Sequence, residues 1–233
     1  MRQPEPLQRS RGLAVAVKSD RKPSRVDWLA LWLSKGSIID GLWVGSFEGK
    51  PHPALRRVEE ALQLIKCHDA LSYARITRNL DRIWVNLLPS ARAHYDTSIN
   101  ACVFDERHVL SETTTIEQIA STIIHEATHA RLEGWGIFYA EAMRARIEAI
   151  CLRRELSFLR KLPNTEIRRD EISRTLEWCV ADHDYFADAS FREREEDGQV
   201  ETLRHLNVPD WLIRWATWMI TRRRKRASVS QGS

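Results

Sequence analysis

The chain has 233 residues, of which 43% are hydrophobic and 29% are charged. These proportions are typical of a globular protein with a buried core, and they exclude collagen-like and intrinsically disordered chains. No apolar run approaches the roughly 20 residues that cross a bilayer, and the apolar stretch near the N-terminus is too short for a secretory signal, so we expect a cytoplasmic protein without a transmembrane segment.

The positive charge lies at the two ends of the chain. The formal net charge is +4, but residues 1–25 carry seven Lys or Arg against two acids and residues 221–233 carry five with no acid. Residues 26–220 are therefore acidic. We expect two flexible basic tails, 1–25 and 221–233, around a single domain at 26–220. An acidic body argues against a nucleic-acid-binding face, apart from the tails.

The first half of the body predicts helices beside a small sheet. We expect a short helix at 27–35, strand-and-turn structure at 37–47, and a helix at 53–67, where apolar residues recur at helical spacing behind a proline. Two runs that favour β structure, 82–88 and 98–104, are separated by a polar loop. A short third strand is expected at 107–110.

The second half of the body is helical. A long amphipathic helix is predicted at 116–130, with Thr114 or Thr115 as its N-cap and Gly134 and Gly136 after its end. Further helices are expected at 137–162, 166–190 and 209–222. The expected fold is thus α+β and mostly helical, with a small mixed sheet packed on the helix at 116–130.

A metal-binding pattern lies within that helix. His125, Glu126 and His129 form the sequence H-E-x-x-H, whose spacing places both imidazoles one turn apart on one helix face. At about 100° per residue, the apolar stripe falls roughly opposite the two histidines, so they are not part of the main core face. The pattern predicts a site for one zinc ion.

A catalytic zinc ion keeps three protein ligands, and Glu148 is the candidate for the third. Eighteen residues separate it from His129, enough for a turn and an antiparallel return helix. On that helix Glu148 falls in a mostly apolar stripe, where a carboxylate needs a compensating charge. An ion pair with Arg144 or a solvated side chain is the alternative, and Glu141 and Glu155 are rival ligands.

The four cysteines lie far apart and form no C-x-x-C pair, so we expect reduced thiols. Cys151 follows Glu148 by three residues. We interpret it as a small packed hydrophobic residue and not as a ligand.

His125-Glu126-x-x-His129, followed by Glu148, resembles the active-site pattern of the gluzincin zinc metallopeptidases, and residues 50–162 resemble the minimal catalytic core of that group. The resemblance implies a zincin-like domain, a zinc cofactor and a peptide or protein substrate. It also implies an edge strand beside the active-site helix that binds an extended peptide; residues 98–104 are the candidate. Relatives often carry an acid four residues after the glutamate ligand, where this chain has Leu152.

Zinc at such a site would activate a water molecule, and Glu126 is the expected general base that takes its proton. Such sites commonly add a hydrogen-bond donor for the developing oxyanion. The candidates here are Tyr139, His183 and Tyr185. The expected activity is that of a zinc metallopeptidase.

Two other functions stay open. A non-catalytic interaction protein could keep the scaffold, with zinc structural or absent, and bind partners through its basic tails; the intact Glu126 argues against it. The same residues could instead hydrolyse a non-peptide amide, because they do not define a specificity pocket.

Overall fold

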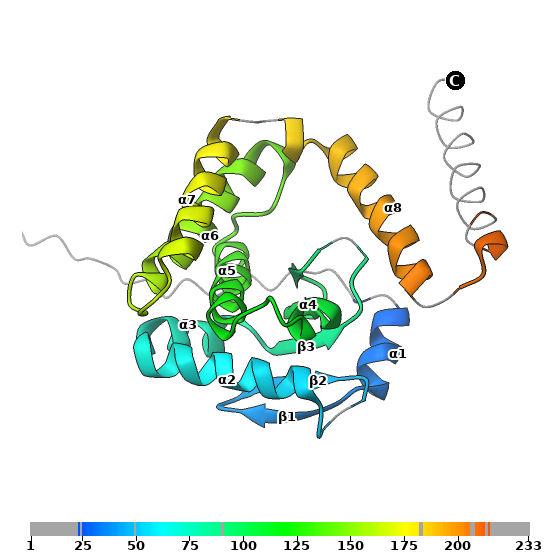
Figure 1. Cartoon of the computed structure of the whole chain (residues 1–233), viewed down its shortest axis with the longest axis horizontal. Coiled ribbons are helices and arrows are strands. Elements are labelled where there is room, and N and C mark those ends of the chain that lie inside the picture. The colour runs from blue at the N-terminus through cyan, green and yellow to red at the C-terminus, as the bar shows by residue number, and fades with distance from the viewer. Residues whose placement is uncertain are drawn as a thin grey trace, which may run out of the picture.

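The computed structural model describes residues 23, 25–48, 50–89, 91–181, 184–205, 208–212 and 214. The predicted tails at 1–25 and 221–233 lie outside these ranges, apart from residues 23 and 25. Within them the protein is α+β and mostly helical, with a small mixed sheet of five strands, as expected (Figure 1). None of the helices in these ranges combines the length and apolarity that a membrane crossing requires.

The N-terminal part of the sheet is a β-hairpin that follows helix α1 (Arg25–Leu33). Strands β1 (Lys35–Ile39) and β2 (Leu42–Ser46) pair antiparallel through a two-residue turn. Asp40 and Gly41 at this turn have φ angles of 48° and 88°. Positive φ at both positions is what a tight hairpin turn requires, and glycine adopts it without steric cost. The predicted strand-and-turn segment is confirmed.

Two helices connect the hairpin to the centre of the sheet. Helices α2 (Pro53–His68) and α3 (Ala70–Asn79) carry the chain to strand β3 (Arg82–Asn86), which pairs parallel with β2. The two strands can be parallel because this long connection returns the chain to the same end of the sheet.

Strand β5 (Ala101–Asp105) is internal, so the prediction that residues 98–104 form the edge strand is wrong. The strand order is β1-β2-β3-β5-β4, and β5 pairs with β3 on one side and with β4 (Ala93–Asp96) on the other. The polar sequence of β4 has the appearance of a loop, but a tight turn folds it back antiparallel onto β5. The edge strand is therefore β4.

Each face of the sheet is covered by helices. Alternate residues of β3 and β5 point to opposite faces, as strand geometry requires. One set packs in the main core with α2, α3 and α5, and it comprises Ile83, Val85, Cys102 and Phe104. The other set packs with residues of α1, and it comprises Trp84, Ala101 and Val103.

The C-terminal half is built from helices, and three boundaries differ from expectation. Residues 107–110 belong to helix α4 (Glu106–Leu110), because β5 already ends at Asp105. Helix α5 (Ile116–Gly134) is followed by α6 (Arg144–Leu159), which begins seven residues later than predicted. The helix expected at 166–190 is divided into α7 (Glu166–Ala181), a 3-10 turn η2 (Asp184–Phe186) and α8 (Asp188–His205).

These helices set the shape of the functional region. Helix α5 packs against α2, α3 and α6, and α6 packs against α7. Figure 1 shows α7 and α8 on opposite sides of the molecule, joined through η2. Most of the helix expected at 209–222 lies outside the described residues.

Candidate metal centre

Helix α5 holds both histidines of the H-E-x-x-H sequence. The helix begins with a capping box, in which the Thr115 side chain accepts from the Gln118 N–H and the Gln118 side chain accepts from the Thr115 N–H. Its apolar stripe, including Ile119 and Ile123, is buried in the main core. His125 and His129 lie on another face, with ring centroids 5.0 Å apart. The predicted cap and apolar stripe are confirmed.

The chain reverses direction between α5 and α6. Gly136 has a φ of +79°, which turns the chain after α5. Residues 137–140 are not helical, and Ala140 has an extended backbone, so the expected helix does not start at 137. A short 3-10 turn, η1 (Glu141–Met143), then leads into α6. This irregular segment brings Tyr139 to the rings of α5.

Glu148 of α6 faces both histidines. Its Oε2 atom lies 3.1 Å from Nε2 of His125, and its Oε1 atom lies 3.4 Å from Nε2 of His129. All three side chains are largely buried, with 12–18% of each exposed. The alternative of a solvated Glu148 is not observed, and Arg144 instead pairs with Asp188.

The protonation states of His129 and Glu148 suit metal binding. Burial, together with the charge of His125, lowers the pKa of His129 to about 4. Burial acts to raise the pKa of Glu148, but the hydrogen bond to His125 and the charges of both rings outweigh it and lower the pKa to about 2. A neutral imidazole and an ionised carboxylate are the forms that bind metal. Two imidazole nitrogens and a carboxylate are also a donor set that zinc accepts.

Glu155 contacts the ring nitrogen of His125 that does not face Glu148, so the geometry does not favour it as a rival ligand. Its Oε1 atom lies 2.6 Å from Nδ1 of His125, on the opposite edge of the ring from Glu148. A carboxylate only accepts hydrogen bonds, so the Nδ1–H donates to it and leaves Nε2 directed at Glu148. Burial opposes a charge on His125, but the hydrogen bonds to Glu148 and Glu155 raise its pKa well above the ordinary value. Glu155 also lies 3.9 Å from Arg168 of α7.

Position 152, where the resemblance to gluzincins would imply an orienting acid, is occupied by leucine. Glu155 lies seven residues after Glu148, two helical turns along the same face. The other rival, Glu141, is exposed and accepts a hydrogen bond from the backbone of Asp188.

Glu126 lies in the same cleft and is a buried carboxylate. Only 7% of the residue is exposed. Burial raises its pKa to about 7, although the charge of His125 and a backbone hydrogen bond from Tyr95 act in the opposite direction. Glu126 can therefore exchange a proton near neutral pH, as a general base must.

The structure brings Tyr139 to Glu148 and His129. Its hydroxyl donates to Oε1 of Glu148 at 2.6 Å, and its ring meets the His129 ring edge-on at 5.3 Å. Burial and the charge of Glu148 raise the pKa of Tyr139 well above its ordinary value, so the hydroxyl keeps its proton. Tyr185 lies further along the cleft wall, against Trp178. His183 lies outside the described residues.

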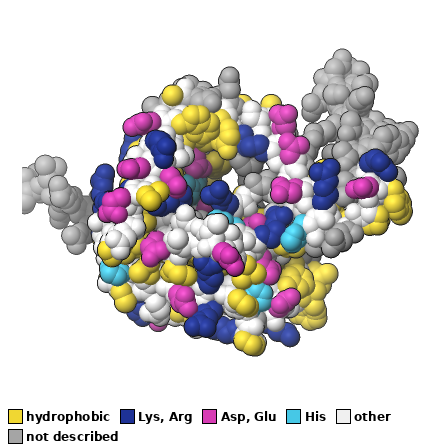
Figure 2. Space-filling model, viewed as in Figure 1, with side chains coloured by type: hydrophobic (Ala, Val, Ile, Leu, Met, Phe, Trp, Pro, Cys, Tyr) yellow, Lys and Arg dark blue, Asp and Glu magenta, His cyan; other side chains and the backbone are white. Residues whose placement is uncertain are grey.

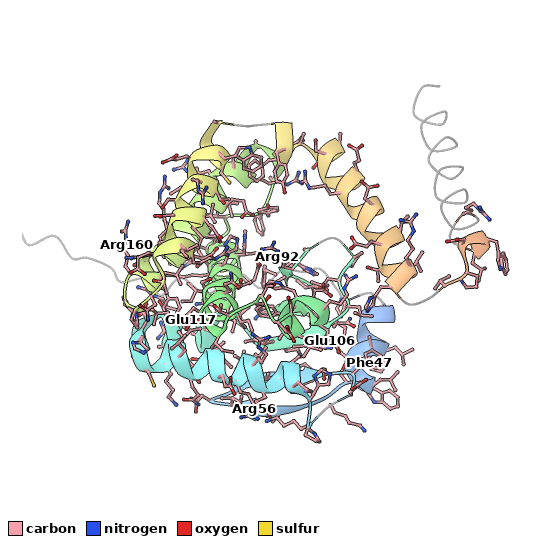
Figure 3. The ribbon with its side chains drawn as sticks, in the orientation of Figure 1. Phe47, Arg56, Arg92, Glu106, Glu117 and Arg160 are labelled. Carbon is pink, nitrogen blue, oxygen red and sulfur yellow. The ribbon has the colours of Figure 1, made fainter. Side chains whose placement is uncertain are left out.

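These groups line a cleft of about 1080 Å³. Strand β4 contributes one wall, and α7, η2 and α8 contribute residues opposite it, including Trp178, Phe186 and Arg194. Figure 2 shows the surface hollowed between α7 and α8. Arg92, which is labelled in Figure 3, immediately precedes β4, the edge strand that borders the cleft.

Cys151 lies close to both histidines. It is fully buried, as predicted, and its sulfur, one ring nitrogen of His125 and one ring nitrogen of His129 all lie within 4.8 Å of one another. Among the described residues, these three form a cluster that could hold a metal ion. The two histidines therefore have two neighbouring donors on α6, Glu148 and Cys151.

Comparisons with models of known protein families, with curated proteins and with solved structures found no match. The function must therefore be inferred from the cleft itself. Its central feature is a buried set of nitrogen, oxygen and sulfur donors from two packed helices, next to a buried carboxylate that titrates near neutrality.

Proposed function

We propose that the protein is a zinc-dependent hydrolase of the gluzincin type that cleaves peptide bonds. One observation carries the proposal: the carboxylate of Glu148 faces Nε2 of both His125 and His129, while Glu126 lines the same cleft. The four residues sit in the arrangement that a catalytic zinc site needs, with three ligands and a separate base.

His125, His129 and Glu148 would hold the ion. When bound, zinc lowers the pKa of water toward neutrality and polarises a carbonyl oxygen. Glu155 keeps the His125 ring in the orientation that directs Nε2 at the ion, through the 2.6 Å hydrogen bond to Nδ1.

Glu126 would act as the proton carrier. Its pKa of about 7 lets it accept a proton from the attacking water and later return it to the leaving amine. Its low exposure keeps bulk water from competing for that proton. A positioned base of this kind contributes roughly 10²–10⁴-fold to the rate.

Tyr139 is the donor best placed to stabilise negative charge on the substrate oxygen. Its protonated hydroxyl already lies at the metal-binding group, on a non-helical segment at the cleft wall. Tyr185 lies with Trp178 and Phe186, so we assign it to substrate contact and not to the chemistry.

The edge strand favours a peptide over a small non-peptide amide as substrate. Among the described residues, strand β4 is the edge of the sheet next to β5, and its residues line the cleft beside α5. An unpaired strand edge can bind an extended peptide through main-chain hydrogen bonds. Glu133 of α5 accepts a hydrogen bond from Thr97, which fixes the end of β4 against the active-site helix.

The decisive experiment separates metal binding from turnover. The purified protein should contain stoichiometric zinc and cleave members of an unbiased peptide library. His129→Ala should lose zinc, whereas Glu126→Gln should keep zinc and lose cleavage. Glu141→Gln is the matched control, because Glu141 is an exposed carboxylate outside the metal-binding group.

Other results would refute the proposal or favour one of the two alternative functions. A wild-type protein that neither contains nor binds zinc would refute it. Stoichiometric zinc without cleavage of any peptide would favour the non-catalytic interaction protein, and cleavage of non-peptide amides alone would favour the amidohydrolase.

A further inference from the structure

Cys151 is a polar group that the proposed reaction does not use. It follows Glu148 by three residues on α6, so both side chains emerge on the same side of the helix. Its sulfur, one ring nitrogen of His125 and one ring nitrogen of His129 lie within 4.8 Å of one another. Bonds of about 2.0–2.3 Å place the ligand atoms around one zinc ion roughly 3–4 Å apart, so small side-chain rotations would bring all three onto one ion.

The surroundings of Cys151 are apolar except where it meets the rings. It packs in a small cluster with Leu132 and Ile147, and none of it is exposed. It is not among the residues that line the cleft, whereas Glu148 is. The sulfur therefore approaches the histidines from beneath the cleft floor.

We propose that Cys151 is an additional protein ligand to the metal ion, which its sulfur binds from the buried side. This inference rests on the proposed zinc site. On coordination, the thiol releases its proton to solvent and binds as the thiolate. Zinc sites sometimes expand from four to five ligands, so the sulfur of Cys151 would join His125, His129 and Glu148 and leave a position for water on the side that faces the cleft.

A thiolate in this position has a chemical consequence. Sulfur is a soft donor that binds zinc in preference to magnesium, calcium or manganese, which prefer oxygen. A set of two imidazoles and one carboxylate is less selective. Cys151 would thus make the site selective for zinc.

Cobalt spectroscopy tests the proposal on the full-length chain. Cobalt(II) substituted for zinc gives a near-ultraviolet charge-transfer band only when a thiolate is bound, and visible ligand-field bands with any donor set. Cys151→Ser should lose the near-ultraviolet band and keep the visible bands. Cys179→Ser is the matched control, because Cys179 is a buried thiol that lines the same cleft outside the cluster. Cys67 is exposed and is replaced by serine throughout, to prevent adventitious binding.

Zinc competition gives a second readout. Cys151→Ser should lower zinc affinity by more than about 10-fold, the lower end of the loss caused by removing even an outer partner of a ligand. Its affinity for manganese should change much less, so the preference for zinc over manganese falls. Cys179→Ser should leave both affinities unchanged.

The outcomes separate this inference from the proposed function. In the Cys67→Ser protein, which keeps Cys151, visible bands without a charge-transfer band would refute Cys151 as a ligand. That result would not contradict the proposed zinc site. A charge-transfer band that survives in Cys151→Ser would also refute Cys151 as a ligand. Failure of the chain to bind either cobalt or zinc would instead refute the metal site itself. Should Cys151→Ser fold poorly by circular dichroism, Cys151→Ala provides the same test, and the spectrum of the Cys67→Ser protein alone can still refute the inference.

Discussion

Replacing Glu155 with glutamine tests how the second carboxylate of α6 supports the metal site. Glu155 is only 4% exposed, and its oxygen lies 2.6 Å from Nδ1 of His125. Glutamine keeps the size of the side chain but removes the negative charge. Partners of this kind contribute about 10–100-fold to metal affinity, which corresponds to roughly 1.4–2.8 kcal/mol.

The zinc affinities of the wild type and of Glu155→Gln should also depend differently on pH. The hydrogen bonds to Glu148 and Glu155 raise the pKa of His125, and zinc must displace the proton on this ring. Wild-type affinity should therefore rise with pH until the pH exceeds that raised pKa. In Glu155→Gln the pKa falls, so the plateau should begin at a lower pH and lie about 10–100-fold below that of the wild type. The difference in zinc affinity between the wild type and Glu155→Gln should become smaller toward acid pH.

Competition with a chromophoric chelator, from about pH 5 up to the pH at which the zinc affinity of the wild type stops rising, measures both effects. Glu171→Gln is the matched control, because Glu171 also pairs with Arg168, at 3.0 Å, but is on α7 and makes no hydrogen bond to His125. Equal zinc affinity of Glu155→Gln and wild type at the plateau would refute the orienting role. An equal loss in both variants would assign the effect to Arg168 instead.

Three further predictions concern the proposed base Glu126, the proposed donor Tyr139 and the N-cap of helix α5. The kcat/KM of the wild type should rise with pH up to about 7, because Glu126 must lose its proton to act as base and a bound zinc ion would only lower the pKa of about 7 that burial gives it; a flat profile from about pH 5 to 7 would count against this role. Tyr139→Phe should lower kcat by about 10²–10³-fold at saturating zinc, and an unchanged kcat would remove Tyr139 from the chemistry. Thr115→Ala should lower the free energy of unfolding by about 1 kcal/mol in urea titrations, because α5 loses its N-cap; the exposed Thr113→Ala should change it by less than half as much.

The parts of the fold that the sequence predicts well are those set by local pattern. Helix α5 has an apolar stripe at helical spacing and a capping box at its start, and both signals lie within the helix itself. The position of Glu148 opposite the histidines also follows from local counting, because eighteen residues fit one turn and one return helix.

The parts that the sequence does not predict depend on contacts between distant segments. Strand β4 has only four residues, too few for its alternation to be a strong signal, and pairing with β5 makes it a strand. Helix α8 is rich in charged residues and has few apolar ones, so its helical period is weak. The roles of Glu155 and Cys151 depend on how α6 rotates against α5, which periodicity within one helix does not fix.

The face of α6 toward α5 explains why these residues occur together. Glu148, Cys151 and Glu155 follow one another at intervals of three and four residues, which is the spacing of one helix face. A purely structural helix pair would bury apolar residues there, since each buried carboxylate costs free energy unless a cation balances it. A proton on His125 can balance Glu148, and so can a divalent ion, but the two compete because the ligand imidazole must be neutral. A charged face of this kind between two packed helices is what we expect if the site binds a metal ion.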